Sequence, residues 1–271
     1  LPVIVAALEA SGRLAHAIIV VTADHGENLY EHGRGIGHGD HLYGLESLHI
    51  PLVFAGGGVP ASPRAVSSTV RSIDVVPTLR GLLSRYVDLE VHSAGPPLIV
   101  DGRDLSPLFG SAEGTEVLAP ASDLPVFAET GLWFIEPETD RLRGRRIAFA
   151  DGFSAFDLDP ATSEVFLAER FEDTAVLAKH RMVLLGDRKL LYIPTRAGVR
   201  WEMYDPVADP AERHDLCAAE PGRFAELRAT LWQWLLADPD MTAVGDFIVP
   251  WRGVPAALHE GMVNGGANGV E

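Results

Sequence analysis

One stretch, residues 17–51, constrains the fold of this chain more than any other. It opens with AIIVVT, a continuous apolar and β-branched run of the kind that favours a strand buried on both faces of a parallel or mixed sheet. The run ends at Asp24-His25-Gly26. Four more histidines follow within the next 24 residues: His32, His38, His41 and His49. We therefore expect a buried strand that delivers an acid and a histidine at its end, where a metal ion could be held.

The Asp24-His25 pair offers a metal ion two kinds of ligand, a hard anionic oxygen and a borderline nitrogen. Adjacent residues on a regular strand point to opposite faces, so both can reach one ion only where the strand breaks, and Gly26 permits a break. A mixed set of oxygen and nitrogen ligands suits Zn²⁺ or Mn²⁺, whereas an all-oxygen set with a more distant histidine suits Ca²⁺ or Mg²⁺. The structural alternative is that Asp24 caps the following turn and His25 packs in the core.

Two further groups in this stretch could take part in chemistry. Glu27 could orient the ring of His25 from behind. His38 stands between two glycines, which allow a close approach of the backbone to a ligand. Its imidazole could donate to a phosphate or sulfate oxygen, or protonate a leaving group. His41 is the rival candidate for this role.

Composition excludes several classes of function. The chain has 271 residues and is 47% hydrophobic, enough for one large domain or for a domain with a smaller unit. It carries 22 Lys and Arg against 38 Asp and Glu, and the resulting charge of −16 argues against general nucleic-acid binding. An acidic chain can still bind an anionic substrate when a metal supplies positive charge. The apolar runs are all shorter than the ~20 residues of a membrane span, and the single cysteine, Cys217, excludes an internal disulfide.

The first part of the chain reads as α/β. Residues 2–14 are expected to form an amphipathic helix, residues 51–55 a second strand and residues 69–72 a third. Residues 75–83 are expected to form a helix capped by Asp74. The side chains expected to be buried on these two helices are Val3, Ala6, Ala7, Leu8 and Leu14 on the first, and Val76, Leu79, Leu82 and Leu83 on the second.

The last part of the chain has a different residue pattern. Three short runs, residues 181–185, 189–194 and 200–204, predict an antiparallel meander, and residues 126–129 predict a further strand. Residues 224–236 predict a helix. Its expected buried face consists of Phe224, Leu227, Leu231, Trp234 and Leu235. We expect three parts: an α/β domain over 1–175, a small α+β subdomain over 176–240, and a partly disordered tail over 241–271.

Several motifs together resemble a known family. TADHGENLYEHG, GHGDHLY, ESLHIPLVF and SIDVVPTL follow one another in the order seen in the second half of the sulfatase branch of the alkaline phosphatase superfamily. The later stretch KLLYIPTRAGVRWEMYDPVADPAERHDL is similar to the closing subdomain of that family. The match covers most of residues 1–110 and 180–237.

The resemblance implies an α/β fold with a mixed central sheet flanked by helices, and hydrolysis or transfer of sulfate or phosphate esters. It implies that Asp24 and His25 are metal ligands, and that His38 contacts the ester, or His41 if the loop shifts. It also implies one divalent ion, Ca²⁺ in a sulfatase or Zn²⁺ or Mn²⁺ in a phospho-transfer relative. The substrate would be a small-molecule or glycan ester.

The chain also departs from the family pattern. Gly44 stands where the family usually has an acid, and the nucleophile motif, Cys/Ser-x-Pro-x-Arg, is not in the sequence; the surroundings of Cys217 do not fit it. We therefore expect a carboxy-terminal part of the enzyme that lacks the N-terminal part of the fold and is inactive alone. The alternatives are a phosphatase, phosphodiesterase or phosphoethanolamine-type transferase, and a non-catalytic binding domain that retains the fold. Compartment and oligomeric state stay open.

Overall fold

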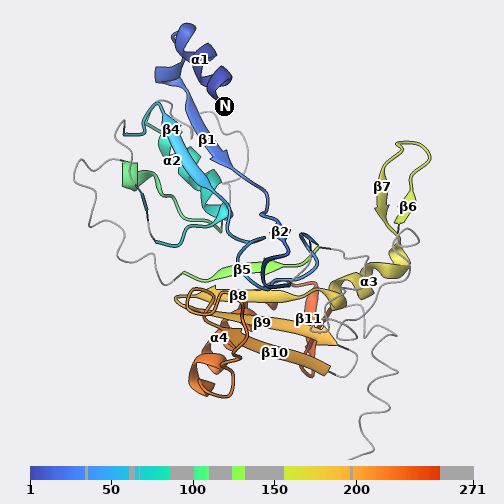
Figure 1. Cartoon of the computed structure of the whole chain (residues 1–271). Helices are drawn as coiled ribbons and strands as arrows, with labels where there is room; N and C mark the ends of the chain where they lie inside the picture. The colour runs from blue at the N-terminus through green and yellow to red at the C-terminus, as the bar shows by residue number, and fades with distance from the viewer. Residues whose placement is uncertain are drawn as a thin grey trace, which may run out of the picture. The chain divides into compact units, whose positions relative to one another are not determined.

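The computed structural model forms two compact units, and the elements of both are labelled in Figure 1. It describes residues 1–33, 36–60, 65–66, 68–85, 101–109, 124–131, 156–195 and 198–250. Unit 1 consists of Leu1–Asp24 and Ile50–Leu124, and unit 2 of His25–His49 and Pro125–Glu271. The segment His25–His49 is called the histidine loop below. The boundary predicted at residue 175 divides the chain differently and stays a prediction.

Unit 1 contains one pair of strands and several short helices. Its elements are α1 (Pro2–Ala10), η1 (Leu14–His16), β1 (Ile18–Thr22), β4 (Leu52–Gly56), η3 (Ser72–Asp74), α2 (Val75–Leu83) and η4 (Ser106–Phe109). β1 and β4 pair antiparallel, with Ile18 opposite Gly56. Gly56 has a φ of 92°, and a Cβ there would lie 2.0 Å from the carbonyl oxygen of Ala17, so only glycine fits. The two predicted strands are confirmed, but the expected burial of the first on both faces is wrong, since Ile18–Val21 are half-buried and Thr22 is exposed.

The strand predicted over residues 69–72 is wrong. The carboxylate of Asp74 accepts the backbone N–H of Arg71 at 2.9 Å and that of Arg103 at 2.8 Å, which curls the chain into η3. This carboxylate therefore faces away from α2, and the predicted side-chain cap of that helix is also wrong. Asp74 closes the preceding turn instead.

The predicted buried stripes of the two helices in unit 1 are largely wrong. Within the described residues α1 has no buried side chain, and Val3 is 82% exposed. On α2, Leu82 is buried as expected, but Val76 is 53% exposed and the buried face includes Pro77 and Thr78. The Thr78 hydroxyl donates to the carbonyl of Asp74 and accepts the N–H of Leu105, so a polar residue anchors this face.

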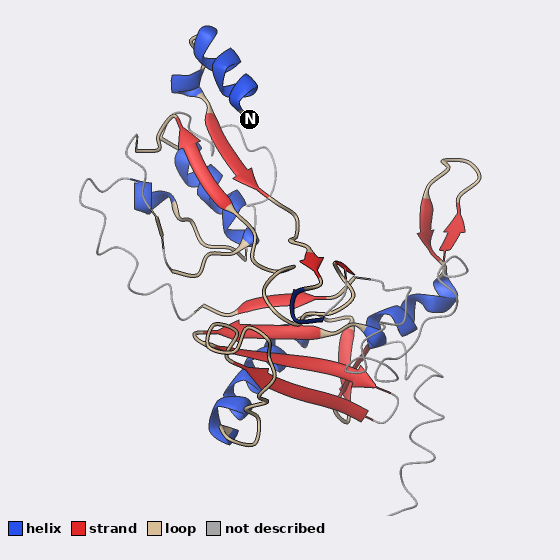
Figure 2. Ribbon diagram, in the orientation of Figure 1, coloured by secondary structure: helices blue, strands red, loops and turns tan. Residues whose placement is uncertain are grey.

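Unit 2 is built on a four-stranded antiparallel sheet in the order β10-β9-β8-β5, shown in red in Figure 2. Its strands are β5 (Val126–Glu129), β8 (Arg181–Leu185), β9 (Arg188–Thr195) and β10 (Gly198–Tyr204). The predicted meander and the predicted strand 126–129 are confirmed. The other elements of the unit are β2 (Asn28–Leu29), η2 (Glu31–Gly33), β3 (Ile36–Gly37), β6 (Phe156–Leu158), β7 (Val165–Leu167), α3 (Glu169–Ala178), α4 (Pro221–Leu235), β11 (Met241–Val244) and β12 (Phe247–Pro250).

Both faces of the four-stranded sheet are covered. One face carries the row Val183–Leu190–Met203, which is fully buried against Leu227 and Leu231 of α4. The opposite face belongs to a second cluster, which joins Leu42 and Tyr43 of the histidine loop to Met182, Leu191, Ile193 and Tyr204. Because successive side chains alternate between the faces, continuous apolar runs such as RMVLL serve both layers.

α4 and the hairpin that follows it complete the core of unit 2. Leu227 and Leu231 are buried as predicted, and Trp234 stacks on Phe127 with ring centroids 4.5 Å apart. Residues 241–250, predicted as part of a tail, form the β11–β12 hairpin, and Ile248 at its centre is fully buried. Gly245 has the positive φ of 60° that the turn requires. Residues 251–271 lie outside the described part of the chain.

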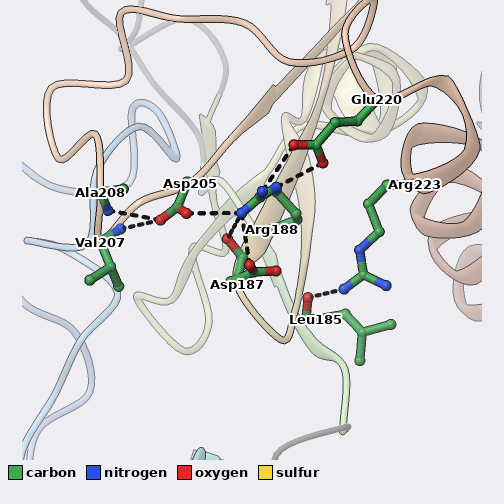
Figure 3. Close-up of polar contacts among 8 residues, drawn as sticks. All are labelled: Leu185, Asp187, Arg188, Asp205, Val207, Ala208, Glu220 and Arg223. Carbon is green, nitrogen blue, oxygen red and sulfur yellow. Dashed lines mark hydrogen bonds and ion pairs between the residues drawn. The ribbon is translucent and has the colours of Figure 1, made fainter.

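A set of ion pairs ties the β8–β9 turn to the start of α4 (Figure 3). The Arg188 guanidinium donates to both carboxylate oxygens of Glu220 at 2.9 Å and to Asp205 at 2.9 Å, and it also pairs with Asp187. These hydrogen bonds from Arg188 lower the pKa of the Glu220 carboxyl. Arg223 donates to the carbonyl of Leu185. None of the helices in the described residues is both long and apolar enough to span a bilayer.

Candidate functional site

The histidine loop begins with a close backbone contact at Gly26. Its N–H donates to the carbonyl of Ser47 at 3.0 Å, and a Cβ on Gly26 would lie 1.9 Å from the carbonyl oxygen of Glu46. The sequence suggested that Gly26 permits a break in the strand. The structure adds another reason for a glycine, since any side chain here would push the two ends of the loop apart.

The structure brings three side chains of the loop together: His25, Glu27 and His38. Each offers a ligand atom, and these atoms lie within 4.8 Å of one another. The imidazoles of His25 and His38 stack with centroids 3.7 Å apart and an interplanar angle of 24°. Glu27 was expected to orient His25, but its carboxylate Oε2 lies 3.0 Å from Nδ1 of His38. The two sequence-predicted residues therefore meet, with a carboxylate beside them.

A short ladder explains why these residues meet although they are far apart in the loop. β2 and β3 pair antiparallel with Asn28 opposite Gly37, and Nδ2 of Asn28 donates to the carbonyl of Gly37 at 3.0 Å. The ladder brings Glu27, which precedes β2, next to His38, which follows β3. The glycines beside His38 have φ values of 119° at Gly37 and 80° at Gly39, which a residue with a side chain rarely adopts.

One hydrogen bond at each ring indicates which nitrogen carries the proton. Nδ1 of His25 lies 2.8 Å from the carbonyl oxygen of Gly26, which can only accept, so Nδ1 carries the proton. Nδ1 of His38 donates in the same way to the Glu27 carboxylate. A histidine whose Nδ1–H is held by an oxygen is the usual form of a metal ligand, which then binds the ion through Nε2. The donor set at this end of the loop therefore fits a divalent ion.

His41 lies in a different environment from His38. His38 is 47% exposed, whereas His41 is 4% exposed. Nδ1 of His41 accepts the backbone N–H of Tyr43 at 3.2 Å, and the two rings are 5.7 Å apart. His41 is thus part of the buried half of the loop. Asp24 is exposed and is the last residue of unit 1, at the covalent junction with the loop, and its role as a ligand stays a prediction.

Sequence reasoning missed the residues that hold the buried half of the loop. Lys189, Glu202 and Glu212 are each fully buried, although such side chains are almost never fully buried unless paired. Tyr43 donates its hydroxyl to Glu202 at 2.8 Å, and Lys189 donates to the carbonyl of Leu42 at 2.8 Å. The available signal was a lysine and a glutamate inside otherwise apolar strands.

Comparison with known proteins identifies the fold first. The chain superimposes on a 2-O GAG sulfatase with a TM-score of 0.56 and 20% identity, covering 88% of this chain and 40% of that one. It also superimposes on the phosphonate monoester hydrolase of Agrobacterium radiobacter, with a TM-score of 0.51 and 22% identity, covering 93% and 42% of the two chains. These likenesses establish an alkaline-phosphatase-like α/β fold.

The sequence is similar to the same group of proteins. Residues 3–85 match the model of the sulfatase family. Among curated proteins, the low-salt glycan biosynthesis sulfotransferase Agl7 of Haloferax volcanii is 31% identical over 128 residues, which cover 46% of this chain and 31% of that protein. The chain thus spans about a third to two fifths of the length of these relatives.

Proposed function

We propose that this chain contributes the metal-binding histidine loop of an enzyme that hydrolyses sulfate esters, with a glycan or a small-molecule ester as substrate. The observation that carries the proposal is the meeting of His25, Glu27 and His38 in the histidine loop, inside the segment that matches the sulfatase family. The likeness to a 2-O GAG sulfatase supports a glycan ester as the substrate class.

The proposed roles follow from the donor atoms. Asp24 and His25 would supply two ligands to one divalent ion, which when bound polarises the ester oxygens. Nε2 of His25 is the ligand atom, because Nδ1 is held by Gly26. His38 would contact the ester through Nε2, where it can move a proton to the leaving group. We favour His38 over His41 because His38 is exposed beside His25, whereas His41 is buried.

The identity of the ion depends on its other ligands. Further carboxylate oxygens would favour Ca²⁺, the ion proposed for a sulfatase. Nitrogen ligands would favour Zn²⁺ or Mn²⁺, as in a phospho-transfer relative. The fold shared with a phosphonate monoester hydrolase makes phosphonate or phosphate ester hydrolysis the second candidate.

The test compares p-nitrophenyl sulfate with phenyl p-nitrophenylphosphonate. We expect the 271-residue chain alone to show negligible turnover, and a protein extended upstream to the length of its relatives to cleave one of the two esters. His38→Ala should lower kcat by about 10²–10⁴-fold, the range for loss of a general acid or base. Asp24→Ala should abolish both activity and binding of the ion by calorimetry.

A matched control is available in the same loop. His32 is exposed like His38 but lies outside the three-residue cluster, so His32→Ala should leave kcat and ion binding unchanged. Turnover by the pure 271-residue chain would contradict the expectation that this chain lacks the nucleophile. If the extended protein binds neither Ca²⁺ nor Mn²⁺ and cleaves neither ester, the enzyme assignment is wrong and a binding domain that retains the fold becomes the better description.

A further inference from the structure

The side chain of Lys189 is fully buried inside unit 2. Nζ donates to the carbonyl of Leu42 at 2.8 Å and to the carbonyl of Gly44 at 2.6 Å, and it forms an ion pair with Oε1 of Glu212. Oxygen atoms of three residues thus lie around a group that can only donate. Two of the three belong to the histidine loop.

Glu212 contacts the same loop residues from the other side. Its Oε2 accepts the backbone N–H of Gly44 at 2.9 Å, so both polar backbone groups of Gly44 are bound by this ion pair. Gly44 has a φ of 73°, which suits glycine. Glu212 itself has a φ of 49°, a strained conformation for a residue with a long side chain, which persists only where the surroundings hold it.

Lys189 and Glu212 therefore form hydrogen bonds with the loop backbone in addition to their ion pair. Three backbone groups of the buried loop, the carbonyls of Leu42 and Gly44 and the N–H of Gly44, would be buried without these hydrogen bonds if Lys189 and Glu212 were apolar. Unsatisfied buried backbone groups are rare in native proteins because they are costly. An apolar replacement of both side chains, which often rescues a simple buried ion pair, cannot restore these three bonds.

We propose that Lys189 and Glu212 are positioning residues for the histidine loop. They hold Leu42 and Gly44, which lie on either side of Tyr43, and the N–H of Tyr43 in turn fixes the tautomer of His41. The loop between this clamp and β3 carries His38. The clamp thus sets the position of His41 and of the adjoining segment with His38, the histidine that the proposed function places at the ester, and this assignment rests on that function.

The test uses the 271-residue chain and three variants: Lys189→Met, Glu212→Gln and the double variant Lys189→Met/Glu212→Leu. The matched control is Arg188→Met, which removes the neighbouring ion-pair set on the opposite face of β9; its partners, drawn in Figure 3, are Asp187, Asp205 and Glu220. Amide hydrogen exchange is followed at Tyr43 and Gly44 in the loop, and at Val183 and Leu190 in the sheet. Long-range ¹H–¹⁵N spectra report which ring nitrogen of His41 carries the proton.

We expect Lys189→Met to speed exchange at Tyr43 and Gly44 at least tenfold more than at Val183 and Leu190. It should also shift the Nδ1 resonance of His41 toward an average of the two tautomers. Glu212→Gln, which keeps an acceptor for Gly44, should show the same pattern with a smaller change and serves if Lys189→Met does not fold. The double variant should not recover the wild-type pattern, and Arg188→Met should leave both readouts of the loop unchanged.

Two results would overturn the proposal. One is loop exchange in Lys189→Met or Glu212→Gln that rises only in step with the sheet amides, which indicates a loss of stability alone. The other is a double variant with wild-type loop protection, which indicates that only the paired charges matter. Neither readout uses ester hydrolysis, so failure of the extended protein to cleave an ester would refute the proposed function and leave these measurements to decide on the clamp.

Discussion

The β1–β4 pair of unit 1 and the four-stranded sheet of unit 2 bury different kinds of residues. β1 and β4 include the chain's most β-branched run, yet within the described residues neither strand has a fully buried side chain. The four-stranded sheet of unit 2 contains Lys189 and Glu202, and both are fully buried. The number of covering layers, and not the polarity of the strand, decides which residues are buried.

The polar interior of unit 2 follows from what covers it. α4 covers one face with leucines, and the histidine loop covers the other with backbone groups as well as with Leu42 and Tyr43. A loop brings unpaired N–H and C=O groups into the core, so the sheet beneath it must supply charged partners. Unit 2 should therefore be sensitive to loss of polar groups at the loop and of apolar groups at α4, and α1 of unit 1 should tolerate change.

The largest expected effect is at Glu202. Its carboxylate accepts hydrogen bonds from the hydroxyls of Tyr43 and Tyr204 and pairs with Arg200. Arg200 is 43% exposed, so Glu202→Ala leaves no buried charge unpaired, but it leaves the buried hydroxyls of Tyr43 and Tyr204 without their acceptor. At about 1–3 kcal/mol for each unsatisfied donor, it should destabilise the chain by about 2–6 kcal/mol in urea unfolding. Tyr43→Phe removes one hydrogen bond to a charged group and should cost about 1.5–3 kcal/mol. A cost below about 1 kcal/mol for Glu202→Ala would show that the polar core contributes little.

The next effect compares the apolar cores. Leu231 of α4 is fully buried, so Leu231→Ala should destabilise by about 3 kcal/mol through the cavity that it leaves. Val3 of α1 is exposed, and Val3→Ala should change the free energy of unfolding by less than about 0.5 kcal/mol. If Leu231→Ala and Val3→Ala lowered the free energy of unfolding equally in the same denaturation assay, α1 would have to be covered in solution.

The smallest effect concerns acid. Burial raises the pKa of the Glu129 carboxyl, but Arg181 and Lys179 outweigh it and hold that pKa below its usual range. A lowered pKa means that this carboxylate stabilises the fold above about pH 4.3, the ordinary value for Glu, and that the contribution is lost as the pH falls through the folded-state pKa. Between pH 5 and pH 3 the wild type should lose up to about 1 kcal/mol more than Glu129→Gln. If the stabilities of the two proteins, measured by thermal unfolding, fall equally with pH across this range, the assignment is refuted.

Much of the fold could be predicted from residue patterns. The strands of the meander are correct to within about two residues, because turn residues such as Gly186-Asp187 separate apolar runs there. The failures share a cause, which is contacts that a local residue pattern does not reveal. The carboxylate of Asp74 bonds backward to Arg71 instead of capping α2. Ile248 is buried by a partner sheet.

The candidate site was predictable in residue type but not in pairing. His25 and His38 were singled out by the end of a strand and by flanking glycines. Their stacking, and the hydrogen bond from His38 to Glu27, depend on the two-residue ladder of β2 and β3, which is too short to show periodicity. The clamp at Lys189 joins residues 147 positions apart, a separation that local sequence cannot encode.

That separation has a consequence for the order of events on the ribosome. Leu42 leaves the exit tunnel 147 residues before Lys189, and at about 5–20 residues per second this interval is on the order of 7–30 s. During translation the nascent loop has no lysine to bind and must remain hydrated, which its glycines, histidines and acids allow. The earliest-made catalytic candidates of the chain would then be immobilised only when one of its later strands is synthesised.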